Sequence, residues 1–190
     1  MKAIPYKLIL ASQSPRRQQL MKDAGYAFEI RIKDTAENYP PDLKAGDIAL
    51  HIAEIKAAAF KGELAANELL ITADTIVWLE DQALGKPVDR NDAVSMLQRL
   101  SGKMHRVYTG VCLTSMERSK SFVSMTEVYF KTLTLNEIEY YIDHYKPYDK
   151  AGSYGAQDWL GLVGIEKING SYFNVMGLPV KELYEAILQY

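Results

Sequence analysis

The chain lacks the features that mark several protein classes. Cys112 is its only cysteine, so no internal disulfide can form. Chains without disulfides are typical of a reducing compartment. The N-terminal apolar run ends at PRR (15–17) and is shorter than a signal peptide requires. No window of the sequence approaches the length of a membrane span, which is about 20 apolar residues. We therefore expect a cytoplasmic protein without a membrane partner.

A strong charge of either sign is also absent, because the formal net charge is −2. The chain has no global positive field, and its aromatic residues are not interleaved with basic ones. Nucleic acid is therefore not an expected partner. The three histidines share no spacing typical of zinc ligands. Any anion site must be local, built from a few lysines and arginines.

The 48% of apolar residues fall into alternating strand and helix patterns. This alternation predicts an α/β or mixed α+β fold, and the length suits one domain, residues 1–190. AFEIRI (27–32) predicts a half-buried strand with Phe28, Ile30 and Ile32 on its apolar face. Asp47 is expected to cap a long helix. LLITADTIVWLE (69–80) predicts a central strand that polar residues interrupt around position 74.

The stretch ASQSPRR places two serines and two arginines where a strand meets a helix. Ser14 suits the helix cap and Pro15 the first helical position. A helix N-terminus favours anions, to which Ser12 and either Arg16 or Arg17 would add donors. The phosphate-binding pattern G-x-x-x-x-G-K-[ST] is absent. A capped helix with two solvated arginines explains the same residues equally well.

Acidic residues provide the second candidate site. Asp74 lies between apolar residues in ITADTIVW, and a buried acid needs a metal, a cation or hydrogen bonds. It is a candidate metal ligand or general base. The alternative is a carboxylate that caps a turn at a strand end. Glu37, in a polar loop, matters only if the fold brings it near Asp74, because Mg²⁺ takes one or two carboxylates plus phosphate oxygens.

Two lysines and one glutamine complete the candidates. Lys56 lies beside the apolar stripe of the long helix, and Lys86 precedes a proline in LGKP. Singly each is typical of a surface lysine, but together they would neutralise a triphosphate. Gln157 ends KAGSYGAQ and offers both a donor and an acceptor to a base edge. A structural glutamine in a glycine-rich turn is the alternative.

Several motifs occur together in the order of one family. They are LILASQSPRRQQLM, ITADTIVW, LGKP, SGKMHRVYTG, DKAGSYGAQ and NGSYFNVMGLP, and they cover roughly residues 8–179. The chain resembles the Maf family of nucleoside triphosphate pyrophosphatases. The resemblance implies hydrolysis of a nucleoside triphosphate to the monophosphate and pyrophosphate, with a divalent metal such as Mg²⁺ or Mn²⁺. It also implies a fold like that of inosine triphosphate pyrophosphatases, with two lobes and flanking helices around a long mixed sheet and a central cleft.

The resemblance assigns roles by motif position. It implies that Asp74 is the proton acceptor of the A-D-T turn, and that Arg16, Thr75 and Gln157 are associated with base selectivity. Metal binding would fall to Glu37 and Asp74. The loop that holds Glu37 departs from the family, which often has two acids there, whereas this chain has Ala36 before Glu37.

The motif DKAGSYGAQ resembles the branch of the family that acts on dTTP and UTP. We therefore expect a pyrophosphatase for these nucleotides, and modified pyrimidine nucleotides are further candidate substrates. A different base specificity, such as 7-methyl-GTP, stays open. A nucleotide-binding regulator of cell division without turnover is a second alternative. A homodimer is expected by analogy only.

Overall fold

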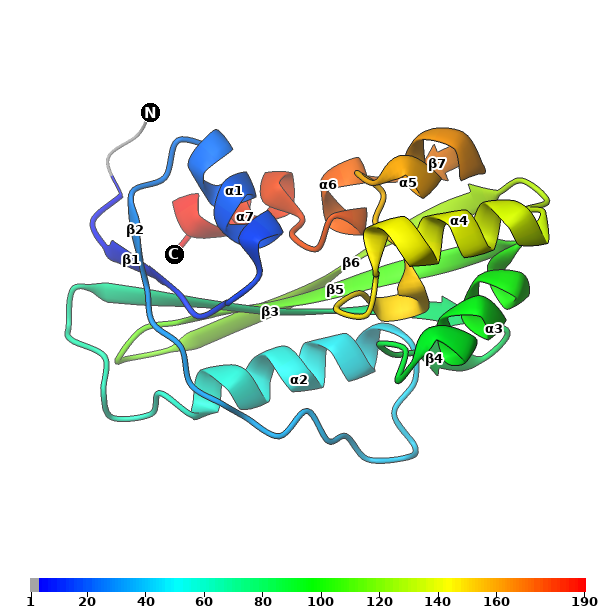
Figure 1. Ribbon diagram of the computed structural model, residues 1–190. Helices are drawn as coiled ribbons and strands as arrows, with labels where there is room; N and C mark the ends of the chain where they lie inside the picture. Colours follow the sequence, from blue (N-terminus) through cyan, green and yellow to red (C-terminus); the bar gives the residue numbers. More distant parts are fainter. Residues whose placement is uncertain (1–3) are drawn as a thin grey trace.

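A seven-stranded mixed sheet runs through the computed structural model, which describes residues 4–190 (Figure 1). Residues 1–3 of the expected domain lie outside this range. The strands are β1 (Lys7–Leu10), β2 (Phe28–Ile30), β3 (Glu68–Leu79), β4 (Gln82–Leu84), β5 (Met104–Thr114), β6 (Ser119–Phe130) and β7 (Ile165–Asn169). The helices are α1 (Pro15–Asp23), α2 (Gly46–Ala58), α3 (Arg90–Leu100), α4 (Leu135–Tyr145), the 3₁₀ turn η1 (Ala151–Ser153), α5 (Trp159–Gly164), α6 (Tyr172–Val175) and α7 (Val180–Leu188).

The sheet has both parallel and antiparallel pairs. Its order is β2-β1-β3-β5-β6-β7, and β4 also pairs with β3. Strand β1 is parallel to both of its neighbours, β2 and β3. All other pairs are antiparallel. The predicted mixed α/β fold is confirmed.

The edge of β3 opposite β5 has a gap. Strand β1 pairs with residues 68–71 of that edge, and β4 pairs with residues 77–79. Within the described part of the chain, residues 72–76 have no strand partner there, although β5 pairs with all of them on the other edge. The carboxyl end of β1 and the start of α1 therefore lie beside the middle of β3.

Helices cover both faces of the sheet (Figure 1). Helix α2 covers the face that carries Leu70 and Ile76. Helices α1 and α7 pack on the other face, over Ile71 and Ala73. Successive strand residues point to opposite faces. Asp74 therefore points to the α2 side and Thr75 to the α1 side.

Gly110 lets α2 approach the sheet closely. It lies directly opposite Asp74 in the β3–β5 register. A Cβ on Gly110 would lie 2.4 Å from backbone atoms of Ala49 and Leu50 in α2. A hydrogen bond of 2.7 Å from Thr72 Oγ1 to the carbonyl oxygen of Ala53 holds the next turn of the helix on β3.

Three local predictions need correction. Strand β2 is shorter than 27–32, and Ile30 and Ile32 are 48% and 45% exposed, because β2 is an edge strand. Helix α2 begins at Gly46 after Ala45, so Asp47 lies in the first turn rather than at the cap. Strand β3 continues without interruption through Asp74, because β5 supplies a complete ladder on one side.

The predicted start of α1 is confirmed, because Ser14 caps the helix and Pro15 is its first residue. Helix α4 begins at a capping box of Thr134 and Glu137. Cys112 is buried in the core. Among residues 4–190, no helix is long and apolar enough to span a bilayer.

Candidate active site

A cleft of about 680 Å³ opens at the gap in the edge of β3. Its walls come from the loop after β1, the segment between β2 and α2, the middle of β3, the turn after β4 and the loop after α4. All ten residues predicted from the sequence line it: Ser12, Ser14, Arg16, Arg17, Glu37, Lys56, Asp74, Thr75, Lys86 and Gln157. The fold thus brings together residues that are up to 145 positions apart, from Ser12 to Gln157.

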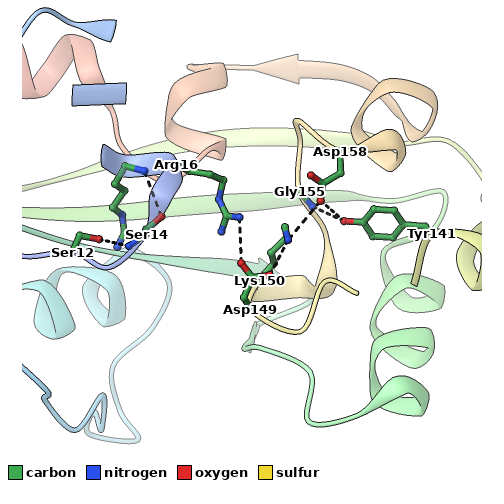
Figure 2. Close-up of polar contacts among 9 residues, drawn as sticks. Ser12, Ser14, Arg16, Tyr141, Asp149, Lys150, Gly155 and Asp158 are labelled. Atoms are coloured by element: carbon green, nitrogen blue, oxygen red, sulfur yellow. Dashed lines mark hydrogen bonds and ion pairs between the residues drawn. The ribbon is translucent and has the colours of Figure 1, made fainter. Parts of the chain in front are cut away.

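The start of α1 forms one wall. Ser14 Oγ accepts a hydrogen bond of 3.4 Å from the backbone N–H of Arg17, and the buried Ser12 Oγ accepts one of 3.2 Å from the N–H of Ser14 (Figure 2). The two hydroxyls thus stabilise the sharp bend between β1 and α1. The positive end of the helix dipole therefore lies at the cleft, where an anion is favoured.

The two arginines of this wall have different surroundings. Arg16 extends across the cleft, and its Nη1 lies 3.4 Å from Asp149 Oδ2 (Figure 2). Arg17 instead donates to two neutral acceptors, the carbonyl oxygen of Gly177 at 2.7 Å and Thr75 Oγ1 at 3.0 Å. Burial lowers the pKa of Arg17, and the charges of Asp74 and Glu37 counteract this effect. Arg17 ties α1 to β3 and to the segment before α7.

On the α2 side, one lysine joins the two acids. Lys56 Nζ lies 2.7 Å from Asp74 Oδ1 and 2.7 Å from Glu37 Oε1. The side chains of Lys56 and Asp74 are only 17% and 13% exposed, whereas that of Glu37 is 47% exposed. The condition set for Glu37 is met, because the fold does bring it near Asp74. The alternative of a turn-capping Asp74 is wrong, since this residue lies in mid-strand.

Glu37 is stabilised in its charged form. Burial by itself would raise the pKa of Glu37, but the contact with Lys56 and the charges of Lys56, Lys86 and Arg17 together lower it. The carboxylate is therefore ionised at neutral pH, as a metal ligand must be.

The two carboxylates fit a divalent metal only in combination with other ligands. Among residues 4–190, no cluster of three or more His, Cys, Asp or Glu side chains could hold a metal ion. Lys56 contacts one oxygen of each carboxylate, Asp74 Oδ1 and Glu37 Oε1, so each carboxylate has a second oxygen to offer. Mg²⁺ is commonly bound by one or two carboxylates together with substrate phosphates and water. The pair fits that mode of binding.

Thr75 belongs to a hydrogen-bonded network on the opposite face. Its Oγ1 lies 2.9 Å from Thr109 Oγ1, which donates to the backbone oxygen of Asn174 at 3.3 Å. Asn174 is fully buried, and its amide donates to Val107, Ser124 and Thr126. Thr75 therefore has a fixed position beside Arg17.

Lys86 and Gln157 lie on the exposed rim. Both residues are exposed, and both line the cleft. Lys86 follows β4 after Gly85 and precedes the buried Pro87. Gln157 lies in the segment that connects η1 to α5. Their exposure suits residues that meet a ligand rather than the core.

Sequence reasoning missed Asp149, Lys150 and Tyr39 as lining residues. The first two lie at the start of DKAGSYGAQ, so the motif itself was the signal, but their ion pairs across space could not be read from it. Tyr39 lies two residues after Glu37 in the same loop. A position that close to a candidate ligand was the available signal.

The chain is similar to known proteins over almost its whole length. The family model described as Maf-like protein matches residues 7–190. A protein of Bacteroides fragilis named dTTP/UTP pyrophosphatase is 55% identical over 185 residues, which is 97% of this chain and 96% of that protein. A protein of the same name from Flavobacterium johnsoniae is 52% identical over 180 residues, 95% and 93% of the two chains.

Among solved structures, the nucleoside-triphosphatase / dITP/XTP pyrophosphatase of Mycobacterium abscessus aligns with a TM-score of 0.38 and 13% identity. The alignment covers 65% of this chain and 74% of that one.

Proposed function

Because this chain belongs to the Maf family, we propose that it hydrolyses dTTP and UTP to the nucleoside monophosphate and pyrophosphate. Curated relatives that are 48–55% identical over most of the chain carry that name. The observation that carries the proposal is the contact of Lys56 with both Asp74 and Glu37 in a cleft that a helix N-terminus also lines. Such a site has acidic side chains that can bind a metal and orient a water, together with cations that can bind phosphates.

The phosphate groups would bind at the start of α1. Ser12, Ser14 and Arg16 supply hydrogen-bond donors there, and the helix dipole favours negative charge. Lys86 would approach the phosphates from the rim of the cleft. Arg17 would contribute its charge and hold Thr75 in place, since its side chain already binds Thr75 and Gly177.

Asp74 would orient the attacking water and accept its proton. The strand backbone and the contact with Lys56 fix the carboxylate, so little reorganisation is required during the reaction. Lys56 would stabilise the charge that develops on the α-phosphate and the leaving pyrophosphate. Glu37 and Asp74 would hold Mg²⁺ or Mn²⁺, which when bound supplies charge neutralisation and activates water.

The pyrimidine would lie between Thr75 and Gln157. The Gln157 amide offers a donor and an acceptor, which are the groups needed to read a pyrimidine edge. This assignment rests on the family resemblance and on the position of both residues in the cleft.

The domain organisation, the location and the oligomeric state are proposed from the sequence. We propose that residues 1–190 act as one domain whose two lobes enclose the cleft. A cytoplasmic location suits a protein whose substrate is the nucleotide pool. The homodimer expected by analogy remains a prediction that size-exclusion chromatography with light scattering would test.

The test is pyrophosphate release from dTTP, UTP, 7-methyl-GTP and GTP at a fixed concentration of Mg²⁺. We expect turnover of dTTP and UTP, and a loss of about a hundredfold or more for Asp74→Asn, as for removal of a general base. Asp81→Asn, the same change in the exposed turn between β3 and β4, is the matched control. Near wild-type turnover by Asp74→Asn would reject the role of Asp74.

The choice of nucleotides separates the alternatives. Preference for 7-methyl-GTP would reject the base specificity but keep the reaction. Binding of dTTP without release of pyrophosphate, at any divalent metal, would favour a nucleotide-binding regulator instead.

A further inference from the structure

The carboxylate of Asp149 lies between two cations that belong to different walls of the cleft. Its Oδ2 is 3.4 Å from Arg16 Nη1 on α1, and its Oδ1 is 2.8 Å from Lys150 Nζ (Figure 2). All three residues line the cleft. Arg16 and Lys150 thus form an anion site across the cleft, and a side chain of the protein fills it.

Lys150 has a second acidic neighbour besides Asp149. Its side chain is only 13% exposed, and its Nζ also lies 3.7 Å from Asp158 Oδ2. That oxygen accepts a hydrogen bond of 2.8 Å from the buried Tyr141 hydroxyl, which itself accepts one of 3.0 Å from Gly155 N (Figure 2). The ammonium group therefore has a second carboxylate partner that is anchored to the core.

The close packing around Lys150 requires a glycine at position 155. A Cβ there would lie 2.5 Å from Asp158 Oδ2 and 3.0 Å from Lys150 Cε. The segment therefore brings the lysine and its second acid together at a backbone position without a side chain. Such an arrangement fixes a lysine, which is otherwise a flexible residue with high rotamer entropy.

Asp149 is the most exposed member of the group. Its side chain is 60% exposed, and exposed ion pairs contribute little to stability. Burial would raise the pKa of Asp149, but the hydrogen bond from Lys150 and the charges of Lys150 and Arg16 lower it. The group is thus an anion at neutral pH, and it can turn into solvent at small cost.

We propose that Lys150 is a further substrate-binding residue, and that the Asp149 carboxylate holds the place of a substrate phosphate until the nucleotide binds. The inference rests on the proposed function, because it takes a triphosphate as the ligand. A phosphate offers several charged oxygens to Arg16 and Lys150, where Asp149 offers two. When the phosphate enters, Asp149 leaves, and Asp158 keeps the Lys150 ammonium in position.

The proposal predicts opposite effects for two neighbouring residues. Lys150→Met removes a cation and should weaken triphosphate binding by about tenfold, the range for a charged hydrogen bond. Asp149→Asn removes the competing anion and should strengthen binding by about threefold, as expected for an exposed ion pair. Lys150→Arg retains the charge and should remain within about threefold of the wild type.

The measurements are the Kd of inorganic tripolyphosphate by titration calorimetry and the KM for dTTP. Asp143→Asn is the matched control for Asp149→Asn, because Asp143 also pairs with an arginine, Arg90, on the surface outside the cleft. Lys103→Met, which breaks the exposed pair with Glu80, is the control for Lys150→Met. Both controls should leave the Kd and the KM unchanged.

Three outcomes would overturn the proposal. They are an unchanged Kd in Lys150→Met, a raised or unchanged Kd in Asp149→Asn, and a change in Kd of equal size in the control variants. If the unchanged Kd of Asp149→Asn came with a loss of kcat, Asp149 would act in the chemical step instead. A wild-type protein that binds tripolyphosphate but releases no pyrophosphate from dTTP would reject the proposed function instead. The Kd values of the two variants would still decide the inference.

Discussion

Lys56 Nζ lies 2.7 Å from Asp74 Oδ1, although the two residues belong to different layers of the molecule. Asp74 is in the middle of β3, and Lys56 is in the last turn of α2, which crosses that face of the sheet. Ala49, which lies closest to Gly110, is seven residues before Lys56 in the helix. Seven residues make about two helical turns, so both lie on the side that faces the sheet.

Gly110→Ala should therefore separate Lys56 from Asp74. The new Cβ would meet the backbone of Ala49 at 2.4 Å, and a backbone cannot rotate away as a side chain does. We expect α2 to move outward, with a loss of about 1–3 kcal/mol in the free energy of unfolding. Turnover should fall as well, because the ammonium moves with the helix.

Urea denaturation and pyrophosphate release would measure the two effects of Gly110→Ala. Gly85→Ala is the control for stability, since no heavy atom lies within 4 Å of the position of its Cβ. Equal stabilities for the two variants would show that α2 adapts to the added methyl group.

Lys56→Met should lower kcat rather than raise KM. The lysine contacts both acids, so its loss removes positive charge where the leaving group departs and leaves two carboxylates to repel each other. We expect a decrease of about a hundredfold, as for the loss of one preorganised donor. Steady-state kinetics of Lys56→Met and Lys56→Arg would test this, and a change confined to KM would contradict it.

The two arginines should differ in what they control. Arg17→Lys loses the hydrogen bonds to Gly177 and Thr75, and we expect a cost of about 1–3 kcal/mol in stability. Arg16→Lys breaks only a half-exposed pair with Asp149 and should change stability by less than about 1 kcal/mol, while raising the KM for dTTP. Thermal and urea unfolding with parallel kinetics would measure both, and equal losses of stability would reject the distinction.

Buried His105 should make the fold sensitive to acid. Burial lowers the pKa of His105 from 6.5 to about 3. The unfolded chain therefore binds a proton below pH 6.5 that the folded chain does not bind. The stability that the neutral His105 contributes is fully present above pH 6.5 and is lost as the pH falls towards about 3. At about pH 5, the free energy of unfolding has fallen by about 2 kcal/mol.

The variant His105→Gln removes this titration and is the natural comparison. Its free energy of unfolding should depend less on pH than that of the wild type between about pH 7 and about pH 5. Nε2 of His105 lies 2.7 Å from the hydroxyl of Tyr154, which lines the cleft. Because the folded His105 stays neutral down to about pH 3, its titration should leave nucleotide affinity unchanged between about pH 7 and about pH 5. Parallel pH profiles for the two proteins would contradict the assignment.

Local chemistry made much of the fold predictable. Ser14 and Pro15 mark the start of α1, and both appear where the sequence places them. The T-x-x-E spacing of Thr134 and Glu137 is likewise that of the capping box at the start of α4. The position of a strand within the sheet, at its edge or in its middle, was not predictable in this way. Ile30 and Ile32 alternate as a buried strand would, yet they are exposed, because β2 is the edge strand of the sheet.

The sequence by itself determined which residue types are available for the site, because motifs are local and their chemistry depends on side-chain identity. Only the tertiary structure decided how these residues are divided between two faces of one strand. Asp74 and Thr75 are adjacent in sequence, but strand alternation directs one to Lys56 and the other to Arg17. Tertiary structure also separated Arg16 from Arg17 and placed Asp149 between two cations, because such contacts depend on the packing of α1 and the α4–α5 loop around the gap in β3.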